Sequence, residues 1–402
     1  MTDTDRGGVA GRVAESRKLA GLTQTQLAMR ANVSLSLLRK VEQGSKPASP
    51  AFVSTVARAL NVGVAELLGQ PFVRSTRDEH EMHATIPPLR RELSAYCVQP
   101  DEEPQPRPLA VLAADVAEAS RLRHAVNLAA LGKALPGLLA ELRAATWTLA
   151  GSEQEHAYWL LAETYYATSQ TAYKLGYIDL ASLAVDRYEW AAARCGDPLA
   201  MLVGDYQRAG EMISAADFSG AAKLLDRSRE TIADQVKGAD SPTLAMWGNL
   251  HLKSGLAAAR DGDCATADAH LAEARETAER IGTDRDDYRL CFGPTNVGIW
   301  SVGLAVEAQD GTEAVKRAAS FTPGASAPRE RVGHHWIDLA RGYLLHGDHE
   351  RAVSTLMLAK QTAPQQTRYH PMVHETIRAL ARARRRSDPV ARLAAWAGVR
   401  ES

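Results

Sequence analysis

Residues 21–44 constrain the fold more than any other segment, because they carry the signals of two short helices joined by a tight turn. Thr23 stands where an N-cap belongs, and Gln26 follows three residues later, which is the spacing of a capping box. Ser34 is placed to cap a second helix that stops at Gly44. Two helices joined in this way have the geometry that places the second helix in the major groove of DNA.

Two further helices are predicted around this pair. The first spans Val9 to Ala20 and ends at Gly21, a residue suited to a left-handed C-cap, and the last spans Phe52 to Leu60. Apolar residues at helical spacing supply the expected small core: Leu22, Leu27, Ala28, Val33, Leu38 and Val41.

The charge is distributed unevenly along the chain. Residues 1–70 hold nine Lys/Arg and five Asp/Glu, a net charge of +4, whereas the whole chain carries −1. A basic head on an acidic body is typical of a protein that contacts nucleic acid at one end only.

The 402 residues allow two or three domains. We expect a DNA-binding domain at 1–69, a linker at 70–108 and a helical domain at 109–402. The linker combines a short helix predicted at Leu89–Tyr96 with a Pro-rich segment at 100–108, which disfavours regular structure. Hinged motion between head and body would follow from such a linker.

Composition also suggests a cellular location. No apolar stretch approaches the ~18 residues needed to cross a bilayer. The four cysteines are far apart and form no CxxC pair, so we expect reduced thiols: Cys97, Cys195, Cys264 and Cys291. The sequence therefore predicts a cytoplasmic protein that associates with the nucleoid when it binds DNA.

The body predicts helices throughout and contains a repeat. A turn residue is followed five positions later by alanine in five places: Gly176/Ala181, Ala216/Ala221, Gly262/Ala267, Gln309/Ala314 and Gly347/Ala352. The steps between these alanines are 40, 46, 47 and 38 residues, within the range of helical-hairpin repeats. The last copy has the clearest spacing of bulky and small residues: Trp336, Leu339, Ala340, Tyr343, Gly347, Ala352, Leu356, Ala359 and Pro364.

This last copy resembles the tetratricopeptide (TPR) signature nearly position for position. Residues 9–69 resemble the phage-repressor-type (Xre) helix-turn-helix domain. The whole chain is similar to actinobacterial Xre-type regulators with TPR-like C-terminal bodies. More distantly, it resembles the peptide-pheromone-sensing transcription factors of Gram-positive bacteria. These resemblances imply an all-α fold, with an N-terminal repressor-like domain followed by a TPR-like α-solenoid.

The Xre resemblance implies roles for residues in the head. Gln24 would open the second helix at a backbone phosphate, and four residues would face the groove: Ser34, Leu35, Ser36 and Lys40. Lys40 would donate to guanine, and Leu35 would contact a thymine methyl group. Many relatives have a polar residue at the position of Leu35, so fewer polar base contacts are expected here.

Other charged residues of the head have different predicted roles. Arg39 and Lys46 are better placed for phosphates than for bases. Arg17 and Glu42 match a pair that forms an internal salt bridge in the family, so we interpret both as structural.

A stack of helical hairpins has a concave face lined by the first helix of each pair. Polar and aromatic residues recur at the positions expected on that face: Asn249, Lys253, Asn296, Trp300, His334, Asp338 and Arg341. Two asparagines could hold the backbone of an extended peptide, and Arg341 or Lys253 could bind a carboxylate. The same residues would also suit a partner-protein or dimerisation surface, or a wet lining without a ligand.

The sequence contains no nucleophile elbow, HExxH motif or paired carboxylates, so we expect no enzyme activity. His334, His335, Asp338 and His346 lie on different faces of one helix, so we expect no metal and no cofactor. The arginines at 378, 382 and 384–386 favour a solvated helix end over an auxiliary nucleic-acid contact.

The sequence therefore predicts a homodimeric regulator that binds an inverted repeat in double-stranded DNA, with a body that senses a peptide or small-molecule effector and with no membrane partner. The alternative hypothesis is a ligand-independent regulator whose body recruits proteins as a scaffold. An enzyme with an appended DNA-binding head is disfavoured, because the sequence contains no catalytic constellation.

Overall fold

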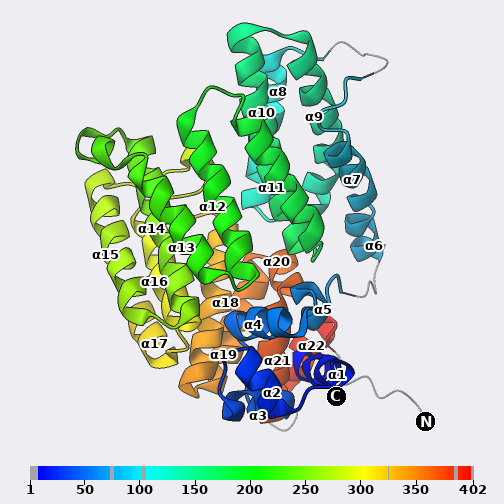
Figure 1. Cartoon of the computed structure of the whole chain (residues 1–402), viewed down its shortest axis with the longest axis vertical. Helices are drawn as coiled ribbons and strands as arrows, with labels where there is room; N and C mark the ends of the chain where they lie inside the picture. Colours follow the sequence, from blue (N-terminus) through cyan, green and yellow to red (C-terminus); the bar gives the residue numbers. More distant parts are fainter. Residues whose placement is uncertain (1–7, 73–76, 101–105, 325, 384–387, 400–402) are drawn as a thin grey trace.

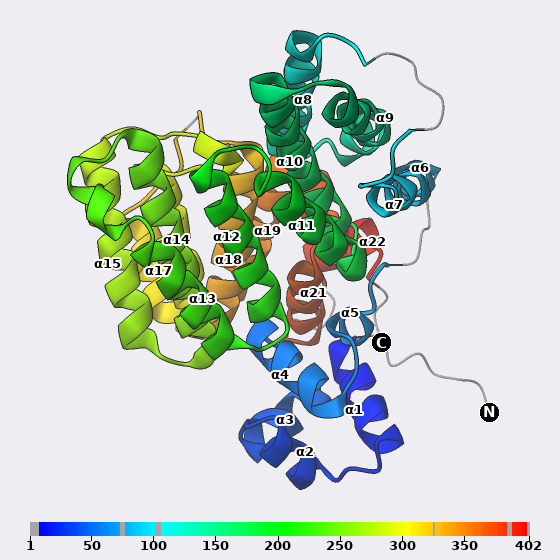
Figure 2. The same cartoon turned by 45° about the horizontal axis from the view of Figure 1, so that its top comes forward.

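The computed structural model describes residues 8–72, 77–100, 106–324, 326–383 and 388–399. Within these ranges the fold is all-α, as predicted, and the isolated bridge between Arg285 and Phe292 is its only β-structure. None of the helices in the described ranges is long and apolar enough to cross a membrane. Figures 1 and 2 show a small head at one end of a curved stack of helices.

The head is built from five helices: α1 (Val9–Leu19), α2 (Gln24–Arg30), α3 (Leu35–Glu42), α4 (Pro50–Leu60) and α5 (Val64–Leu68). The predicted caps are present. The Thr23 side chain accepts a hydrogen bond from the backbone N–H of Gln26, and the Gln26 side chain accepts one from the backbone N–H of Thr23. The Ser34 hydroxyl accepts from the backbone N–H of Leu37 and so starts α3.

The Arg17–Glu42 pair forms the predicted salt bridge inside the head. The Arg17 Nε lies 2.6 Å from the Glu42 Oε1, and both side chains are largely withdrawn from solvent. Arg17 also donates to the carbonyl of Leu22, and the amide of Gln24 donates to Glu42. The pair therefore fixes α3 against α1 and the start of α2.

The body consists of six antiparallel helical hairpins. Their paired helices are α8 (Leu109–His124) with α9 (Leu128–Thr148), α10 (Gly151–Lys174) with α11 (Ile178–Ala192), α12 (Pro198–Ser214) with α13 (Phe218–Glu230), α14 (Ser241–Asp261) with α15 (Cys264–Ile281), α16 (Pro294–Glu307) with α17 (Gly311–Ala319), and α18 (Arg329–His346) with α19 (His349–Thr362). Two 3₁₀ turns, η1 (Ala233–Gly238) and η2 (Asp287–Arg289), lie in the connections. Three helices complete the chain: α20 (Pro364–Tyr369), α21 (Pro371–Ala383) and α22 (Asp388–Ala397).

The repeat predicted from sequence corresponds to the turn inside each of five hairpins. All five turn residues have a positive φ: Gly176, Ala216, Gly262, Gln309 and Gly347. The alanines five positions later are all buried between the paired helices: Ala181, Ala221, Ala267, Ala314 and Ala352. In four of the turns an aspartate follows directly and caps the second helix with its carboxylate: Asp217, Asp263, Asp310 and Asp348.

The segment between head and body contains two helices, α6 (Arg77–His83) and α7 (Ile86–Ser94). Only the second was predicted. Both pack on α9, and α7 also packs on α11, so their apolar side chains join the largest core of the body: Met82, Ile86, Leu89 and Leu93. Residues 101–105 of the predicted Pro-rich segment lie outside the described residues.

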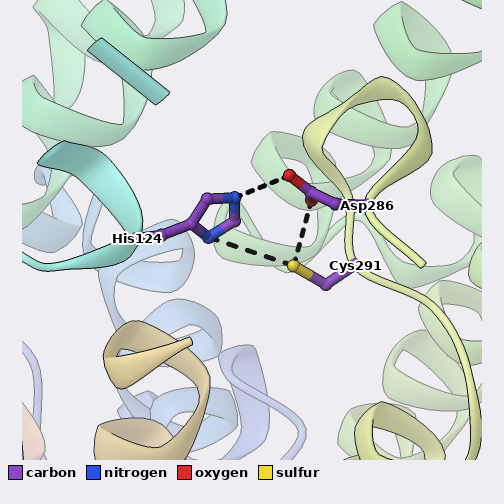
Figure 3. Close-up of side chains that lie close together, drawn as sticks. All are labelled: His124, Asp286 and Cys291. Carbon is purple, nitrogen blue, oxygen red and sulfur yellow. Dashed lines mark hydrogen bonds and ion pairs between the residues drawn. The ribbon is translucent and has the colours of Figure 1, made fainter. Parts of the chain in front are cut away.

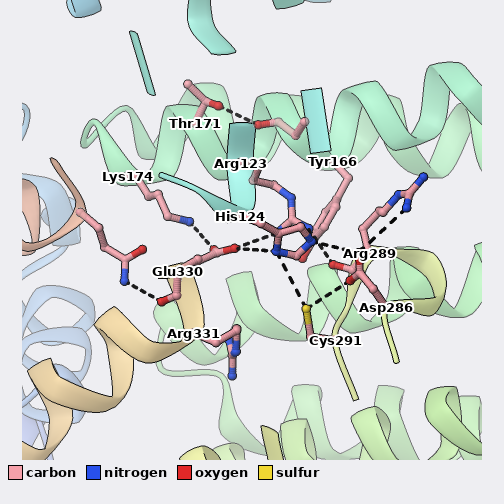
Figure 4. Close-up of polar contacts among 12 residues, drawn as sticks. Arg123, His124, Tyr166, Thr171, Lys174, Asp286, Arg289, Cys291, Glu330 and Arg331 are labelled. Carbon is pink, nitrogen blue, oxygen red and sulfur yellow. Dashed lines mark hydrogen bonds and ion pairs between the residues drawn. The ribbon is translucent and has the colours of Figure 1, made fainter. Parts of the chain in front are cut away.

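The two ends of the hairpin stack meet at Glu330, at the start of α18. Its Oε2 lies 2.9 Å from Nη1 of Arg123 on α8, and its Oε1 lies 2.6 Å from Nζ of Lys174 on α10. All three side chains are at most 8% exposed. Burial alone would raise the pKa of Glu330, but Lys174 and Arg123 outweigh it and hold that pKa far below its usual range. Figure 4 shows these side chains converging on the carboxylate.

Replacing Glu330 with glutamine should destabilise the protein by about 3–5 kcal/mol, because two buried cations lose their counter-charge. Denaturant unfolding at pH 7 measures this loss. Glu118→Gln is the matched control, since Glu118 pairs with Arg121 at the surface and should cost less than about 1 kcal/mol. Because the folded-state pKa of Glu330 is depressed, the difference between wild type and Glu330→Gln should shrink as the pH falls below the ordinary glutamate value of 4.5. Equal stability of the two proteins at pH 7 would contradict this role.

Candidate nucleic-acid interface and effector surface

The outer face of α3 is exposed in the head. Ser36, Arg39 and Lys40 are all exposed, whereas Leu38 and Val41 on the opposite face are buried in the head core. Figure 2 shows α2 and α3 at the edge of the head remote from the hairpin stack. The side chains predicted to read bases are therefore presented outward, next to a basic residue suited to phosphate.

The other four predicted contact residues are partly engaged within the head. Leu35 is half-buried and packs against the head core. The Gln24 amide donates to Glu42 at 2.8 Å, and the backbone N–H of the half-buried Lys46 donates to the Lys40 carbonyl. The Ser34 hydroxyl is used as the N-cap of α3 and is exposed. Their DNA roles stay predictions, with base reading concentrated on Ser36 and Lys40.

The head is docked against the body through α21. The Glu375 carboxylate accepts a 3.4 Å hydrogen bond from the backbone N–H of Val9, the first residue of α1, and a 2.6 Å bond from Arg378. A carboxylate at this position complements the positive end of the helix dipole. Directly after the head, the ring of Phe72 stacks on His374 with 4.0 Å between centroids.

A second docking contact involves the first helices of two hairpins. α4 packs on α12 and α14, and Arg58 donates to the carbonyl of Ala216 at 2.9 Å. Since Ala216 is the turn residue after α12, the head touches one end of the hairpin that carries it.

The arginines at the end of α21 also contact the head. The Arg378 side chain lies over Gly8, and a Cβ at Gly44 would collide with the guanidinium of Arg382. Gly44 has φ +72 and follows the end of α3, so both its backbone and its neighbour favour glycine. Arg378 is thus not a simple solvated cap, because it pairs with Glu375 and lies over Gly8, whereas Arg382 is exposed beside Gly44. Arg384, Arg385 and Arg386 lie outside the described residues.

Comparison with known proteins bears on the head alone. Residues 9–68 match a family described as "Helix-turn-helix domain". The head is a helix-turn-helix domain. No curated protein matches the chain.

One solved structure that matches is a crystal structure of Bacillus thuringiensis PlcR in complex with the peptide PapR7 and DNA. It is 14% identical, and the match covers 68% of this chain and 95% of that chain with a TM-score of 0.31.

The predicted effector residues lie on the first helices of three successive hairpins, α14, α16 and α18. Two of them are occupied by contacts within the chain. The Asn296 amide donates to the carbonyl of Cys291 at 2.6 Å, and its Oδ1 accepts from Nε of Arg331 at 2.8 Å. Arg341 is buried and pairs with both Glu307 and Asp338 at 2.8 Å.

These contacts change the predicted roles of three residues. Asn296 has little capacity left to grip a peptide, because the loop and α18 already use both ends of its amide. Arg341 is not available for a ligand carboxylate, since two carboxylates already neutralise it, and Asp338 is committed to the same pair. We therefore interpret these three side chains as parts of the scaffold.

The other four predicted residues keep groups that a ligand could use. Asn249 is 1% exposed, and its Oδ1 has no hydrogen-bond partner. The ammonium of Lys253 lies 4.0 Å above the ring of Tyr206. Trp300 is half-buried beneath the guanidinium of Arg331, and His334 contacts the ring of His370.

Sequence reasoning missed Arg331 and Tyr206. Arg331 lies three residues before His334 on α18, so the helical spacing that selected His334 also places Arg331 on the same stripe. Tyr206 lies on α12, one hairpin before Lys253, and sequence alone did not show that it would face the ammonium.

A polar cluster at His124, Asp286 and Cys291 was also missed (Figure 3). Nε2 of His124 lies 3.0 Å from Asp286, and the Cys291 thiol donates to Asp286 at 3.1 Å. Burial and the Asp286 charge raise the pKa of the Cys291 thiol well above its usual range, so it is not a reactive thiolate.

The surroundings of this cluster argue for a structural role. Arg123 lies 2.8 Å from the His124 ring and donates to the carbonyl of Arg289. The positive charge of the Arg123 guanidinium disfavours a metal ion at the same point. The cluster instead ties the end of α8 to the loop before α16, in which Tyr288, Arg289 and Cys291 all have positive φ.

Two hollows in the described part of the structure are not lined by the predicted effector residues. One is an internal void of about 10 Å³ between Arg123, Glu163 and Tyr166, and the other is an open hollow of about 1000 Å³ beside α6 and α7. The first has room for about one water molecule.

Replacing Lys253 with methionine should stabilise the protein at pH 7 by about 1–3 kcal/mol, because an unneutralised charge leaves a poorly hydrated position. Burial, and then the charges of Arg260 and Arg331, lower the pKa of Lys253 to about 7. The unfolded chain therefore holds a proton that the folded chain has released between pH 7 and the ordinary value of 10.5. The advantage of Lys253→Met should consequently shrink as the pH rises through that window. Thermal unfolding against pH measures it, with the exposed Lys223→Met as control.

Proposed function

We propose that the chain is a homodimeric, sequence-specific DNA-binding transcriptional regulator whose helical body senses a peptide or small-molecule effector. The observation that carries this proposal is the outward-facing row of Ser36, Arg39 and Lys40 on the second helix of a helix-turn-helix domain. On DNA, Lys40 would donate to a guanine edge, Ser36 to a neighbouring base and Arg39 to a phosphate.

The dimer follows from the small size of the head. One helix-turn-helix domain makes few phosphate contacts, so useful affinity requires two heads on half-sites about one helical turn apart. An inverted repeat fits a two-fold symmetric pair of chains. Such a protein would associate with the nucleoid while bound to its operator.

The docking of the head offers a route from effector to DNA. α12 and α14, which carry Tyr206 and Lys253, both pack on α4. α18, which carries Arg331, packs on α21, and α21 holds the start of α1 through Glu375. An effector acts by binding two arrangements of the body with different affinity. A shift of these helices would change the orientation of each head and its fit to the half-sites.

Replacing Lys40 with alanine should weaken binding to the operator by about 1–3 kcal/mol and leave binding to random DNA nearly unchanged. Fluorescence anisotropy with an operator selected from random sequence measures both affinities at one fixed salt concentration. Lys223→Ala, an exposed lysine on α13, is the control and should not change either value. An equal loss on both DNAs would assign Lys40 to a phosphate, and no loss on either would contradict the proposed interface.

The scaffold hypothesis gives a different result in the same assay. If the body only recruits proteins, small molecules and peptides extracted from cells should leave operator affinity unchanged. If the body is a sensor, one fraction of the extract should shift that affinity in wild type.

A further inference from the structure

Lys253 and Arg331 are the two cations of the effector surface that no carboxylate neutralises. Among the described residues, no salt bridge includes either side chain. Lys253 is held only by the face of Tyr206, and Arg331 only by the Asn296 oxygen and the face of Trp300. Figure 4 shows Arg331 beside the Glu330 cluster without an interaction to any residue drawn there.

The neighbouring cations are compensated. Arg123 and Lys174 share Glu330, and Arg260 and Arg341 share Glu307 at 2.7 and 2.8 Å. The body therefore places a carboxylate opposite each of these four cations. A cation that is largely removed from solvent destabilises the folded state unless a neighbouring anion compensates its charge.

The two cations lie on packed neighbouring elements. Arg331 contacts Asn296 and Trp300 on α16, and α16 packs on α14, which carries Lys253. The Arg331 charge also contributes to the lowered pKa of Lys253. Like charges repel each other, and an anion that binds to both removes that repulsion.

An unused hydrogen-bonding group lies one helical turn from Lys253. The side chain of Asn249 is buried, and its Oδ1 lacks a partner. Buried polar atoms normally have a partner, so this atom indicates a donor supplied by a ligand or water. His334 adds a neutral ring, because burial, and then the charges of Arg331 and Lys174, lower its pKa to about 3.

We propose that the effector carries an anionic oxygen group, a carboxylate or a phosphate, that binds between Lys253 and Arg331. This inference rests on the sensor role in the proposed function and specifies the chemistry of the ligand. Arg331 would donate through its two terminal nitrogens, and Lys253 would supply a point charge. Trp300 and Tyr206 would cover the adjoining part of the ligand.

The test is protection of Lys253 from acetylation in the full-length protein. The protein is treated with limiting acetic anhydride near pH 7.5 in the presence of inorganic phosphate, acetate or trialanine whose amino terminus is already acetylated, at ionic strength fixed with sodium chloride. Mass spectrometry then quantifies the peptide that contains Lys253. The labelling rate of Lys253 should be divided by 1 + [L]/Kd, where [L] is the probe concentration. The rate should therefore fall about tenfold when the probe is present at ten times its Kd. Labelling of exposed Lys223 should not change.

Arg331→Met is the informative variant, because it leaves the reporter lysine in place. Protection of Lys253 should be lost in Arg331→Met and retained in Arg351→Met, whose arginine is on the exposed side of α19. A stronger response to acetate and trialanine would indicate a carboxylate ligand, and a stronger response to phosphate a phosphorylated one. No protection by any probe, or equal protection in wild type and Arg331→Met, would overturn the proposal.

Thermal unfolding provides a second readout that does not depend on lysine chemistry. Phosphate stabilises many proteins by exclusion from their surface, so the relevant quantity is the rise in Tm in wild type beyond the rise in Lys253→Met. A positive difference is expected, and none would contradict an anion site. Operator affinity of the same samples separates this failure from failure of the proposed function, since DNA binding requires Lys40 and not Lys253.

Discussion

The fold of the body depends on the buried contact of Glu330 with Arg123 and Lys174. A hairpin stack touches only its neighbours when it is open, and its ends are then free to move apart. Here one carboxylate at the start of α18 joins α8 and α10, two helices more than 150 residues earlier. The contact holds the last hairpin against the first two hairpins of the stack. Because all three charges are buried, closure depends on their mutual compensation rather than on apolar contact alone.

Because the Glu330 contact joins the ends of the hairpin stack, the charged side chains between the hairpins lie close enough to pair with one another. Four of the stack's cations are matched by carboxylates, whereas Lys253 lies against the ring of Tyr206 and Arg331 against the ring of Trp300. The helices that carry them also contact the head, directly through α4 or indirectly through α21. A ligand that neutralises these two cations would therefore act on the same helices that hold the DNA-binding domain. The proposed regulation therefore requires only the packing of α12 and α14 on α4 and of α18 on α21.

Much of the fold could be predicted because turn chemistry and caps are local. The capping box at Thr23 and the five hairpin turns depend on residues within a few positions of each other. The sixth hairpin was missed because its turn has Val126 at positive φ and its close-packed position holds Leu131 instead of alanine. The roles of Asn296 and Arg341 were not predictable, because their partners come from a loop and a helix whose approach only the closed stack determines. Sequence spacing shows which side chains share a face, but it does not show which of them already have partners.

The DNA-binding role of the head is the central claim, and genome-wide mapping of the DNA bound by the purified protein tests it most directly. Wild type should recover a palindromic motif with half-sites about one helical turn apart. The Ser36→Ala/Lys40→Ala double variant should lose that motif, while its unfolding transition stays unchanged because both side chains are exposed. Motif-free binding by wild type, or the same motif from the double variant, would contradict the account.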